Sequence, residues 1–289
     1  MKEQEYKIES LKSFELADIF DCGQCFRWNK QEDGSYTGVF KGNIMNVQKE
    51  GNTITFKGIC NGNIKEIVED YFDLNRNYEE IKEQLSKIDT HVKTSIEYGQ
   101  GIRILNQDLW EMIISYIISA NNNIPRIKGI IERLSKNYGQ EIEWNGEKYY
   151  TFPSPKELKE VTIEDYRGLG AGFRDVRLHE TVHMILDKKV DLEQMLNNPN
   201  TLEVREQLLT LSGVGPKVAD CIMLFSLQRS EVFPIDVWVK RVMTELYFNE
   251  DKKIEPNNKK ILKFAEDRFG NLAGLAQQYL FYWRRELEK

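Results

Sequence analysis

The chain has 289 residues, of which 40% are hydrophobic and 30% are charged, and its formal net charge is −6. This length accommodates one large hydrophobic core or two medium ones, and two domains are the better expectation. No apolar run is long enough to span a membrane, and the N-terminus MKEQEYKIES lacks the apolar region of a signal peptide, so we expect a cytoplasmic protein without a membrane partner.

The net charge of −6 disfavours a nucleic-acid partner, because affinity for phosphates usually comes from lysines and arginines. It does not exclude such a partner, since glycine turns and helix N-termini bind phosphate through backbone N–H groups that carry no formal charge. Composition therefore leaves the class of partner open.

Residues 26–57 contain four strand-like runs, CFRWN, SYTGVF, IMNVQ and TITFKG, separated by turn residues such as Asp33-Gly34 and Gly51-Asn52. Alternation of apolar and polar positions between such turns predicts an antiparallel meander. The next segments, NIKEIVEDYF and YEEIKEQLSKI, have helical spacing and are expected to cover one face of the sheet. We take residues 1–103 as an α+β domain.

The cysteines, Cys22, Cys25, Cys60 and Cys221, form no dense set, which suits free thiols in a reducing compartment. The spacing of Cys22 and Cys25 also fits half a zinc site or a redox pair. Because no second close pair completes a metal tetrad, we assign no metal there.

After Gly99-Gln100-Gly101 the sequence predicts helix after helix. The segment LWEMIISYIISA, capped by Asp108, is apolar on nearly every face and should be buried. Capping boxes at Ser154 and Thr162 predict two further helix starts. Later helices are expected around FRDVRLHETVHMIL, TLEVREQLLT, PKVADCIMLFSL, DVWVKRVMTEL, NKKILKFAEDRF and GLAQQYLFYWRREL. Residues 104–289 are thus expected to form an all-helical domain, and the whole chain an α+β fold.

The stretch LSGVGPKVADC, residues 211–221, places an amine at the start of a helix. Pro216 fits the first helical position, so Lys217 lies where the partial positive charge of the helix N-terminus disfavours an ammonium ion and favours a neutral nucleophile. Nineteen residues later, Asp236 offers a carboxylate at the predicted cap of the next helix. A plain helix-turn-helix joint, with a solvated lysine and a capping aspartate, explains the same residues.

Two helical faces extend this pattern. Lys217 and Cys221 are four residues apart on one helix, and Gln277 and Phe281 are four apart on the last helix, so each pair shares a face. If the faces meet, they form a pocket with an amine, a thiol, an amide and an aromatic ring, which suits a flat heterocycle. The alternative is a core in which Cys221 and Phe281 simply pack.

The hairpin followed by Pro-Ile-Asp resembles the signature of the helix-hairpin-helix Gly/Pro-Asp DNA glycosylases. The further blocks GQCFRW, ISANNNIPRI, LGAGFR and AQQYLF, in this order, are similar to those of 8-oxoguanine DNA glycosylases with an N-terminal sheet domain. The resemblance extends from about Gly23 to Trp283.

The resemblance implies a bifunctional glycosylase and lyase that acts on damaged duplex DNA as a monomer. Lys217 would attack the sugar C1′, expel the base and form a Schiff base, after which β-elimination cuts the strand. Asp236 would stabilise the oxocarbenium-like centre. The residues Gly213, Val214 and Gly215 would hold the DNA backbone.

The resemblance also implies how the base is flipped and read. Asn121 would fill the vacated space, Phe173 would wedge the stack, and Arg126 and Arg174 would read the cytosine left opposite. The Gly23 carbonyl would accept the hydrogen that 8-oxoguanine, unlike guanine, carries at ring position 7. Cys221 and Phe281 would sandwich the base, and Gln277 would bind its pairing edge.

Two departures limit what is carried over. Trp238 stands where animal relatives have a histidine near a phosphate, so no phosphate role is assigned to it, and no cysteine cluster follows Asp236, so no iron-sulfur cluster is expected. No cofactor is expected to be required. The resemblance implies a structural monovalent cation held by backbone carbonyls near Leu209, Leu211 and Val214.

Other functions were weighed against these residues. His179 and His183 share a helical face, but no carboxylate motif lies between them, so an exposed or capping pair is preferred to a metal site. An alkylbase glycosylase of the same fold would hydrolyse with the aspartate alone and would not need Lys217. A DNA-binding hairpin without chemistry explains the glycines but leaves Lys217, Asp236 and Gln277 unexplained. Action on another oxidised purine remains open.

Overall fold

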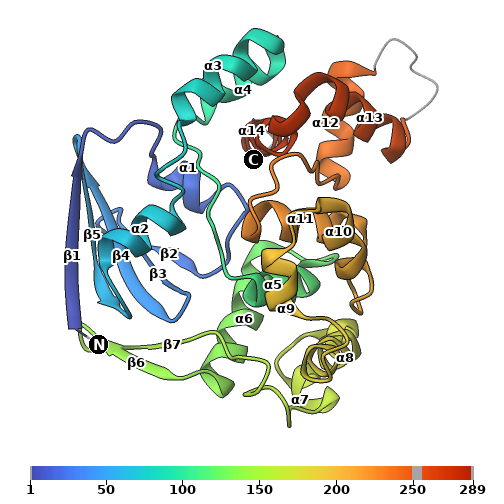
Figure 1. Cartoon of the computed structure of the whole chain (residues 1–289). Helices are drawn as coiled ribbons and strands as arrows, with labels where there is room; N and C mark the ends of the chain where they lie inside the picture. Colours follow the sequence, from blue (N-terminus) through green and yellow to red (C-terminus); the bar gives the residue numbers. More distant parts are fainter. Residues whose placement is uncertain (1, 249–255, 288–289) are drawn as a thin grey trace.

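The computed structural model describes residues 2–248 and 256–287, which form a sheet-based part and a helical part joined by the extended residues 102–108 (Figure 1). The sheet and its helices lie on one side, the helices that follow lie on the other, and the last helix ends near the middle of the molecule. Among the described residues, no helix has the length and apolar character needed to cross a bilayer.

The sheet is antiparallel and has the strand order β1-β5-β4-β3-β2. The strands are β1 (Lys2–Glu9), β2 (Trp28–Lys30), β3 (Tyr36–Phe40), β4 (Asn43–Glu50) and β5 (Thr53–Cys60). The last four confirm the predicted meander. Strand β1 was not predicted, because MKEQEYKIES carries only three apolar residues; it gains its conformation by pairing along β5, from Lys2 with Cys60 to Glu9 with Thr53.

An aromatic cluster fills the space between the sheet and helices α1 (Leu16–Phe20) and α2 (Ile64–Tyr71). The rings of Phe20 and Trp28 stack at 4.3 Å, and the indole of Trp28 donates a 3.0 Å hydrogen bond to the hydroxyl of Tyr71. This cluster fixes the residues on both sides of the loop between Phe20 and Trp28, which reaches the functional site.

Helices α3 (Tyr78–Ile88) and α4 (Thr90–Tyr98) correct one prediction. The first was expected to cover the sheet, yet its buried residues Tyr78, Ile81 and Leu85 belong to the hydrophobic core of the helical part. Helix α4 packs against the final helix, α14 (Ala273–Leu287). Helical spacing predicted that these segments are helices. The apolar face of a helix does not by itself predict whether it packs against the sheet or against other helices.

Two apolar helices form the centre of the helical part, as predicted. Every residue of α5 (Leu109–Ser119) from Leu109 to Ile118 is buried, as is every residue of α11 (Pro216–Ser226) from Val218 to Ser226. The helices pack against each other. Around them lie α6 (Ile124–Tyr138), α7 (Ile163–Gly168), α8 (Asp175–Leu186), α9 (Leu192–Asn197), α10 (Thr201–Leu209), α12 (Val237–Tyr247) and α13 (Asn258–Phe269), with the short 3-10 helices η1 (Gly172–Arg174) and η2 (Gly270–Leu272).

The second part is not all-helical, which corrects the predicted description. Residues Glu141–Trp144 and Glu147–Tyr150 form an antiparallel hairpin, β6–β7, around a turn in which Asn145 and Gly146 both have positive φ. The Asn-Gly pair is the usual signal for such a turn. The buried Ile142 and Trp144 pack with Val39 and Ile44 of the sheet, so the hairpin and the sheet share a small apolar cluster separate from the aromatic core.

Of the two helix starts predicted from capping boxes, the one at Thr162 is confirmed and the one at Ser154 is wrong. Thr162 and Asp165 form the expected reciprocal capping box of α7. Ser154 and Glu157 exchange the same two bonds, at 2.7 and 3.3 Å, but the residues that follow form turns rather than a helix. A capping box favours a helix start without supplying the packing that a helix needs.

Gln24 ties the loop after α1 to the extended joint. Its buried side-chain amide donates to the carbonyl oxygens of Ile19, at 2.9 Å, and Arg103, at 2.8 Å, and its Oε1 accepts from the Leu105 N–H at 2.9 Å. The backbone carbonyl of Gln24 accepts from the side chain of Gln107, at 2.8 Å. Buried hydrogen bonds therefore hold the loop both to α1 and to the extended residues 102–108.

We predict that Gln24→Leu lowers the free energy of unfolding by about 3 kcal/mol, because it leaves buried backbone groups without partners. Urea denaturation of the purified protein measures the change. Gln31→Leu removes an exposed amide that bonds only to the Asn29 carbonyl and should shift stability by no more than about 0.5 kcal/mol. Equal effects of the two substitutions would contradict the assignment.

Candidate active site

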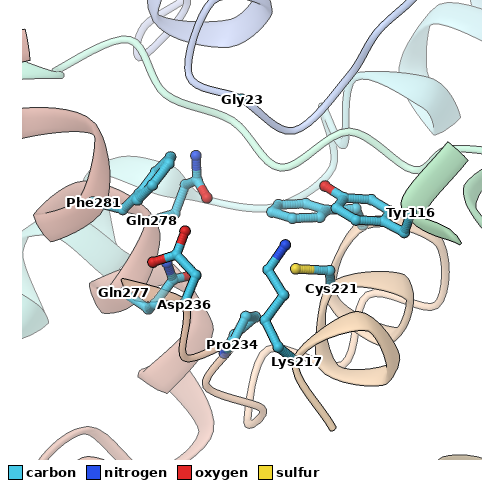
Figure 2. Close-up of a pocket in the computed structure, with 10 residues that line it drawn as sticks. Gly23, Tyr116, Lys217, Cys221, Pro234, Asp236, Gln277, Gln278 and Phe281 are labelled. Carbon is cyan, nitrogen blue, oxygen red and sulfur yellow. The ribbon is translucent and has the colours of Figure 1, made fainter. Parts of the chain in front are cut away.

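The two predicted helical faces meet at one pocket, which the loop after α1 closes. Lys217 and Cys221 enter it from α11, Gln277 and Phe281 from α14, Asp236 from the start of α12, and Gly23 from the loop (Figure 2). The lining of the pocket is completed by four residues that the sequence analysis did not assign: Tyr116, Phe225, Pro234 and Gln278.

Lys217 is half-buried in the first turn of α11, after Gly215 at the N-cap and Pro216. Its ammonium nitrogen lies 5.2 Å from the centroid of the Tyr116 ring, and within the described part of the chain Lys217 forms no salt bridge. Figure 2 shows its amine extending into the pocket beside the Cys221 sulfur. An amine aimed into a cavity, without a carboxylate partner, is available for chemistry.

Asp236 is the N-cap of α12, as predicted, and its Oδ1 accepts a 2.8 Å hydrogen bond from the Val239 N–H. The cap fixes the carboxylate's position, and Figure 2 shows the group lying between Lys217 and the residues of α14. A carboxylate held in this way can stabilise positive charge that develops in the pocket.

The walls of the pocket suit a flat, polar ring. Gln277 is only 4% exposed, yet its Oε1 has no hydrogen-bond partner among the described residues. Burying an amide oxygen without a partner is costly, which indicates that a ligand donor completes the site. Burial raises the pKa of the Cys221 thiol to about 11, so its sulfur is a neutral surface rather than a second nucleophile.

Gly23 has a φ of +87°, a conformation that favours glycine. A methyl group there would lie 2.8 Å from a guanidinium nitrogen of Arg285 and 3.3 Å from the ring of Phe281. The loop is also held by Gln278, whose side chain donates a 2.8 Å hydrogen bond to the Cys22 carbonyl, and by Arg285, which donates to the Asp21 carbonyl. Backbone groups of this loop therefore approach the pocket closely.

The flanking cysteines show no redox or metal arrangement. Cys22 and Cys25 are buried free thiols, and burial raises the pKa of both.

The rings of His179 and His183 lie 4.4 Å apart on α8. Over residues 2–248 and 256–287, no three His, Cys, Asp or Glu side chains are grouped so as to hold a metal ion.

The remaining predicted residues do not line the pocket but gather at the end of α5. Asn121 is exposed, with a φ of +51°, directly after the helix. Phe173 is 55% exposed, Arg126 is exposed and donates to the Gly170 carbonyl at 3.2 Å, and Arg174 is fully buried. We call Asn121, Arg126, Phe173 and Arg174 the gap-side cluster.

The hairpin turn connects α10 to α11. Gly213 has a φ of +85°, and a methyl group there would lie 2.9 Å from the side chain of Arg177 on α8 and 3.3 Å from Ile117 on α5. The turn therefore packs tightly against both helices. Val214 donates to the Leu211 carbonyl at 3.1 Å, while no backbone hydrogen bond reaches the carbonyls of Leu209 or Val214 from elsewhere in the described chain.

The sequence did not predict that Tyr116 and Gln278 line the pocket. Tyr116 lies in a segment predicted to be a buried core helix, and Gln278 follows Gln277, which was already assigned to the site. A single tyrosine inside the apolar LWEMIISYIISA reads as core, and its buried hydroxyl has no partner among the described residues. The doubled Gln277-Gln278 offered a signal, since two buried amides in succession exceed the needs of packing.

Comparisons with known proteins agree with this architecture. The family model of the 8-oxoguanine DNA glycosylase N-terminal domain matches residues 7–113, and that of the HhH-GPD superfamily base excision DNA repair protein matches residues 114–269. The chain is 33% identical over 238 residues to the "Probable N-glycosylase/DNA lyase" of Methanothermobacter thermautotrophicus, which covers 75% of this chain and 74% of the relative.

Two crystal structures of the Clostridium acetobutylicum 8-oxoguanine glycosylase/lyase are similar over nearly their whole length. The apo form is 44% identical, with a TM-score of 0.91 over 98% of each chain. The complex with double-stranded DNA containing cytosine opposite 8-oxoguanine is also 44% identical, with a TM-score of 0.93 over 100% of this chain and 99% of the other. The chain belongs to the HhH-GPD superfamily of base excision DNA repair proteins and, within it, to the 8-oxoguanine DNA glycosylases.

The raised pKa of Cys221 predicts slow alkylation at neutral pH. In folded protein at pH 7.5, iodoacetamide should label Cys221 far more slowly than a cysteine peptide with a pKa near ~8.5, and the rate should rise with pH towards about 11. Mass spectrometry of the Cys221 peptide measures the rate, with urea-unfolded protein as the control. If Cys221 in the folded protein reacted with iodoacetamide at pH 7.5 as fast as the cysteine peptide does, burial would not be keeping the thiol protonated.

Proposed function

We propose that this chain flips 8-oxoguanine out of duplex DNA opposite cytosine, excises it through attack by Lys217, and cuts the strand by β-elimination. The observation that carries the proposal is the meeting, in one pocket, of a lysine amine, a capping carboxylate and a buried amide oxygen; within residues 2–248 and 256–287 the amine forms no salt bridge and the amide oxygen has no hydrogen-bond partner. Family membership supports a bifunctional glycosylase and lyase.

The proposed chemistry follows from the positions of Lys217 and Asp236. The side-chain nitrogen of Lys217 forms a bond to the sugar C1′ while the bond from C1′ to the base breaks, and the departing base takes up the proton that this nitrogen loses. Positive charge that develops at C1′ is stabilised by the Asp236 carboxylate. Opening of the sugar gives a Schiff base on Lys217. Removal of a proton from C2′ then forms a C2′–C3′ double bond, expels the 3′ phosphate and cuts the strand by β-elimination.

Recognition of the damaged base is assigned to Gly23, Gln277 and the two side chains that form opposite walls of the pocket, Cys221 and Phe281. The Gly23 carbonyl would accept the N7 hydrogen of 8-oxoguanine and would repel the N7 lone pair of guanine. The Gln277 amide, whose Oε1 accepts no hydrogen bond from the described part of the chain, would bind the pairing edge. Cys221 and Phe281, on opposite helices, would sandwich the ring.

Binding to DNA is supported despite the negative net charge. Arg126, Arg133 and Arg177 form no salt bridge within residues 2–248 and 256–287, so their charges are not cancelled locally. Gly213 and Gly215 present backbone N–H groups at the start of α11, where anions are favoured, while the Val214 N–H already donates to the Leu211 carbonyl. We further expect a monovalent cation at this turn, held by the carbonyls of Leu209, Leu211 and Val214, where it would add positive charge beside a phosphate.

Lys217→Gln should abolish covalent trapping. Borohydride treatment of the wild-type protein with duplex DNA containing 8-oxoguanine opposite cytosine should yield a protein–DNA adduct, and the variant should yield none because an amide cannot form a Schiff base. Gel electrophoresis measures the adduct, and Lys188→Gln, remote in sequence and exposed, serves as the control. An adduct that persists in Lys217→Gln would exclude this lysine as the nucleophile.

Gly23→Ala should reduce discrimination between 8-oxoguanine and guanine, because the methyl group displaces Arg285 and Phe281 and moves the carbonyl. We expect the excision rate for 8-oxoguanine to fall by about 100-fold, the cost of a displacement near 1 Å at a reacting group. Gly34→Ala is the matched control, since Gly34 has a φ of +85° but no neighbour within 4 Å of the added methyl. Similar rates in the two variants would remove the role assigned to Gly23.

A further inference from the structure

A second cavity is lined by different residues from the active-site pocket and lies between strands β2 and β3, helix α6 and the hairpin β6–β7. Its volume is about 300 Å³, which is at the lower end of the range for small-ligand pockets. Buried residues form its floor and exposed cations form its rim. The floor comprises Arg27, Thr37 and Val39, and the rim comprises Arg133, Lys136 and Lys148. We call it the Arg27 cavity.

Arg27 has a hydrogen-bond donor that no described residue uses. The residue is only 4% exposed; its Nε donates to the Glu132 carboxylate at 3.3 Å and its Nη2 to the Tyr150 carbonyl at 2.5 Å. The third nitrogen, Nη1, is buried and has no hydrogen-bond partner among the described residues. Burying a charged donor without a partner is costly, which indicates that an acceptor on a ligand completes the site.

The positive charge of Arg27 is not matched by a buried anion. Glu132 is half-exposed, so solvent weakens its pairing with Arg27. Glu111 of α5 is buried, but in the described chain it forms no salt bridge with Arg27. Burial raises the pKa of Glu111 to about 8, against the opposing effect of Arg27, so at neutral pH this carboxyl is mostly uncharged.

The rim adds cations from two further elements. Lys136, in the last turn of α6, is exposed and forms no salt bridge within residues 2–248 and 256–287. Lys148 of β7 pairs with Glu141 at 2.9 Å, but both side chains are exposed, so this pair is weak. Cations therefore reach the cavity from the residue before β2, from α6 and from β7, on different sides of the same space.

Hydrogen bonds between these elements hold the walls in place. The Lys128 ammonium group, on α6, donates to the Trp28 carbonyl of β2 at 2.6 Å. The bond from Arg27 to the Tyr150 carbonyl joins the start of β2 to β7 in the same way. Because the walls are already fixed to one another, a ligand does not have to order them on binding, which favours affinity.

We propose that the Arg27 cavity binds a phosphate group, to which Arg27 donates from the floor and Lys136 and Lys148 from the rim. A phosphate presents at least three strong acceptor oxygens, so it can accept from cations on several sides at once, whereas a carboxylate has two oxygens in one plane. The small concave volume favours a small phosphate ester, and the backbone of DNA is the other source of the same group. The inference does not rest on the excision chemistry.

Isothermal titration calorimetry of the full-length protein with inorganic pyrophosphate, at an ionic strength held constant with sodium chloride, tests the site. We expect pyrophosphate to bind the wild type, and Lys136→Glu and Lys148→Glu each to weaken binding by about tenfold, because each replaces a donor by a repelling charge. Lys93→Glu is the matched control, since Lys93 is an exposed helical lysine without a salt bridge in the described residues, on α4. It should bind as the wild type does.

Arg27→Lys tests the floor, because it keeps the charge but loses the planar fork of donors. This variant should no longer bind pyrophosphate, and thermal denaturation shows whether it is folded. Should it fail to fold, nitrogen-15 spectra of the wild-type arginine side chains replace it, since the Arg27 guanidinium signal should shift as pyrophosphate is added. A signal that stays unchanged at saturating pyrophosphate would contradict the inference.

Duplex DNA distinguishes the two sources of phosphate. Fluorescence anisotropy measures the affinity of undamaged duplex for the wild type, Lys136→Glu and Lys93→Glu. Equal affinities of the two variants assign the site to a small phosphate ester, whereas a selective loss in Lys136→Glu assigns it to the DNA backbone. Absence of pyrophosphate binding to the wild type, or equal binding by the wild type and both rim variants, would overturn the inference and leave the proposed excision activity untouched.

Discussion

The active site depends on one chain of buried hydrogen bonds that begins at Gln24. Its neighbour Gly23 closes the pocket, while the Gln24 carbonyl accepts from the side chain of Gln107. The backbone N–H of Gln107 donates in turn to the Phe225 carbonyl, at 3.0 Å, near the end of α11. The helix that carries Lys217 is therefore tied to the loop that would read the base. Buried polar groups tolerate little displacement, so these hydrogen bonds hold the loop in place against α11.

Positive charge is concentrated near the end of α5 although the net charge of the chain is −6. The chain has 46 acidic and 40 basic residues, yet several arginines near the end of α5 have no carboxylate partner in the described parts of the chain. The nearby Asp175 is paired with Arg167, at 2.8 Å, so it does not neutralise Arg126 or Arg177. A protein with negative net charge can thus present a positive surface, which is why composition alone could not decide the class of partner.

Much of the site could be predicted from the sequence because it consists of local features. The spacing of Lys217 and Cys221 on one helix, and the cap at Asp236, follow from helical periodicity. Contacts between distant segments could not be predicted in the same way. Strand β1 forms only through pairing with β5, and the pocket-lining position of Tyr116 depends on how α5 crosses α11. The burial of Arg174 is of this kind, since its side chain donates to the carbonyls of Ala120 and Asn121, which lie 54 and 53 residues earlier in the chain.

Helix α5 explains why the two halves of the reaction stay in register. Tyr116 lines the pocket that would receive the flipped base, and Ile117 packs against the hairpin turn. Asn121 lies five residues beyond Tyr116 and two residues beyond Ser119, the last residue of α5. Because α5 is buried along its length, its ends cannot shift independently. The pocket wall at Tyr116 and the chain at Asn121, whose carbonyl accepts a hydrogen bond from Arg174, are therefore held in a fixed relation by one buried helix.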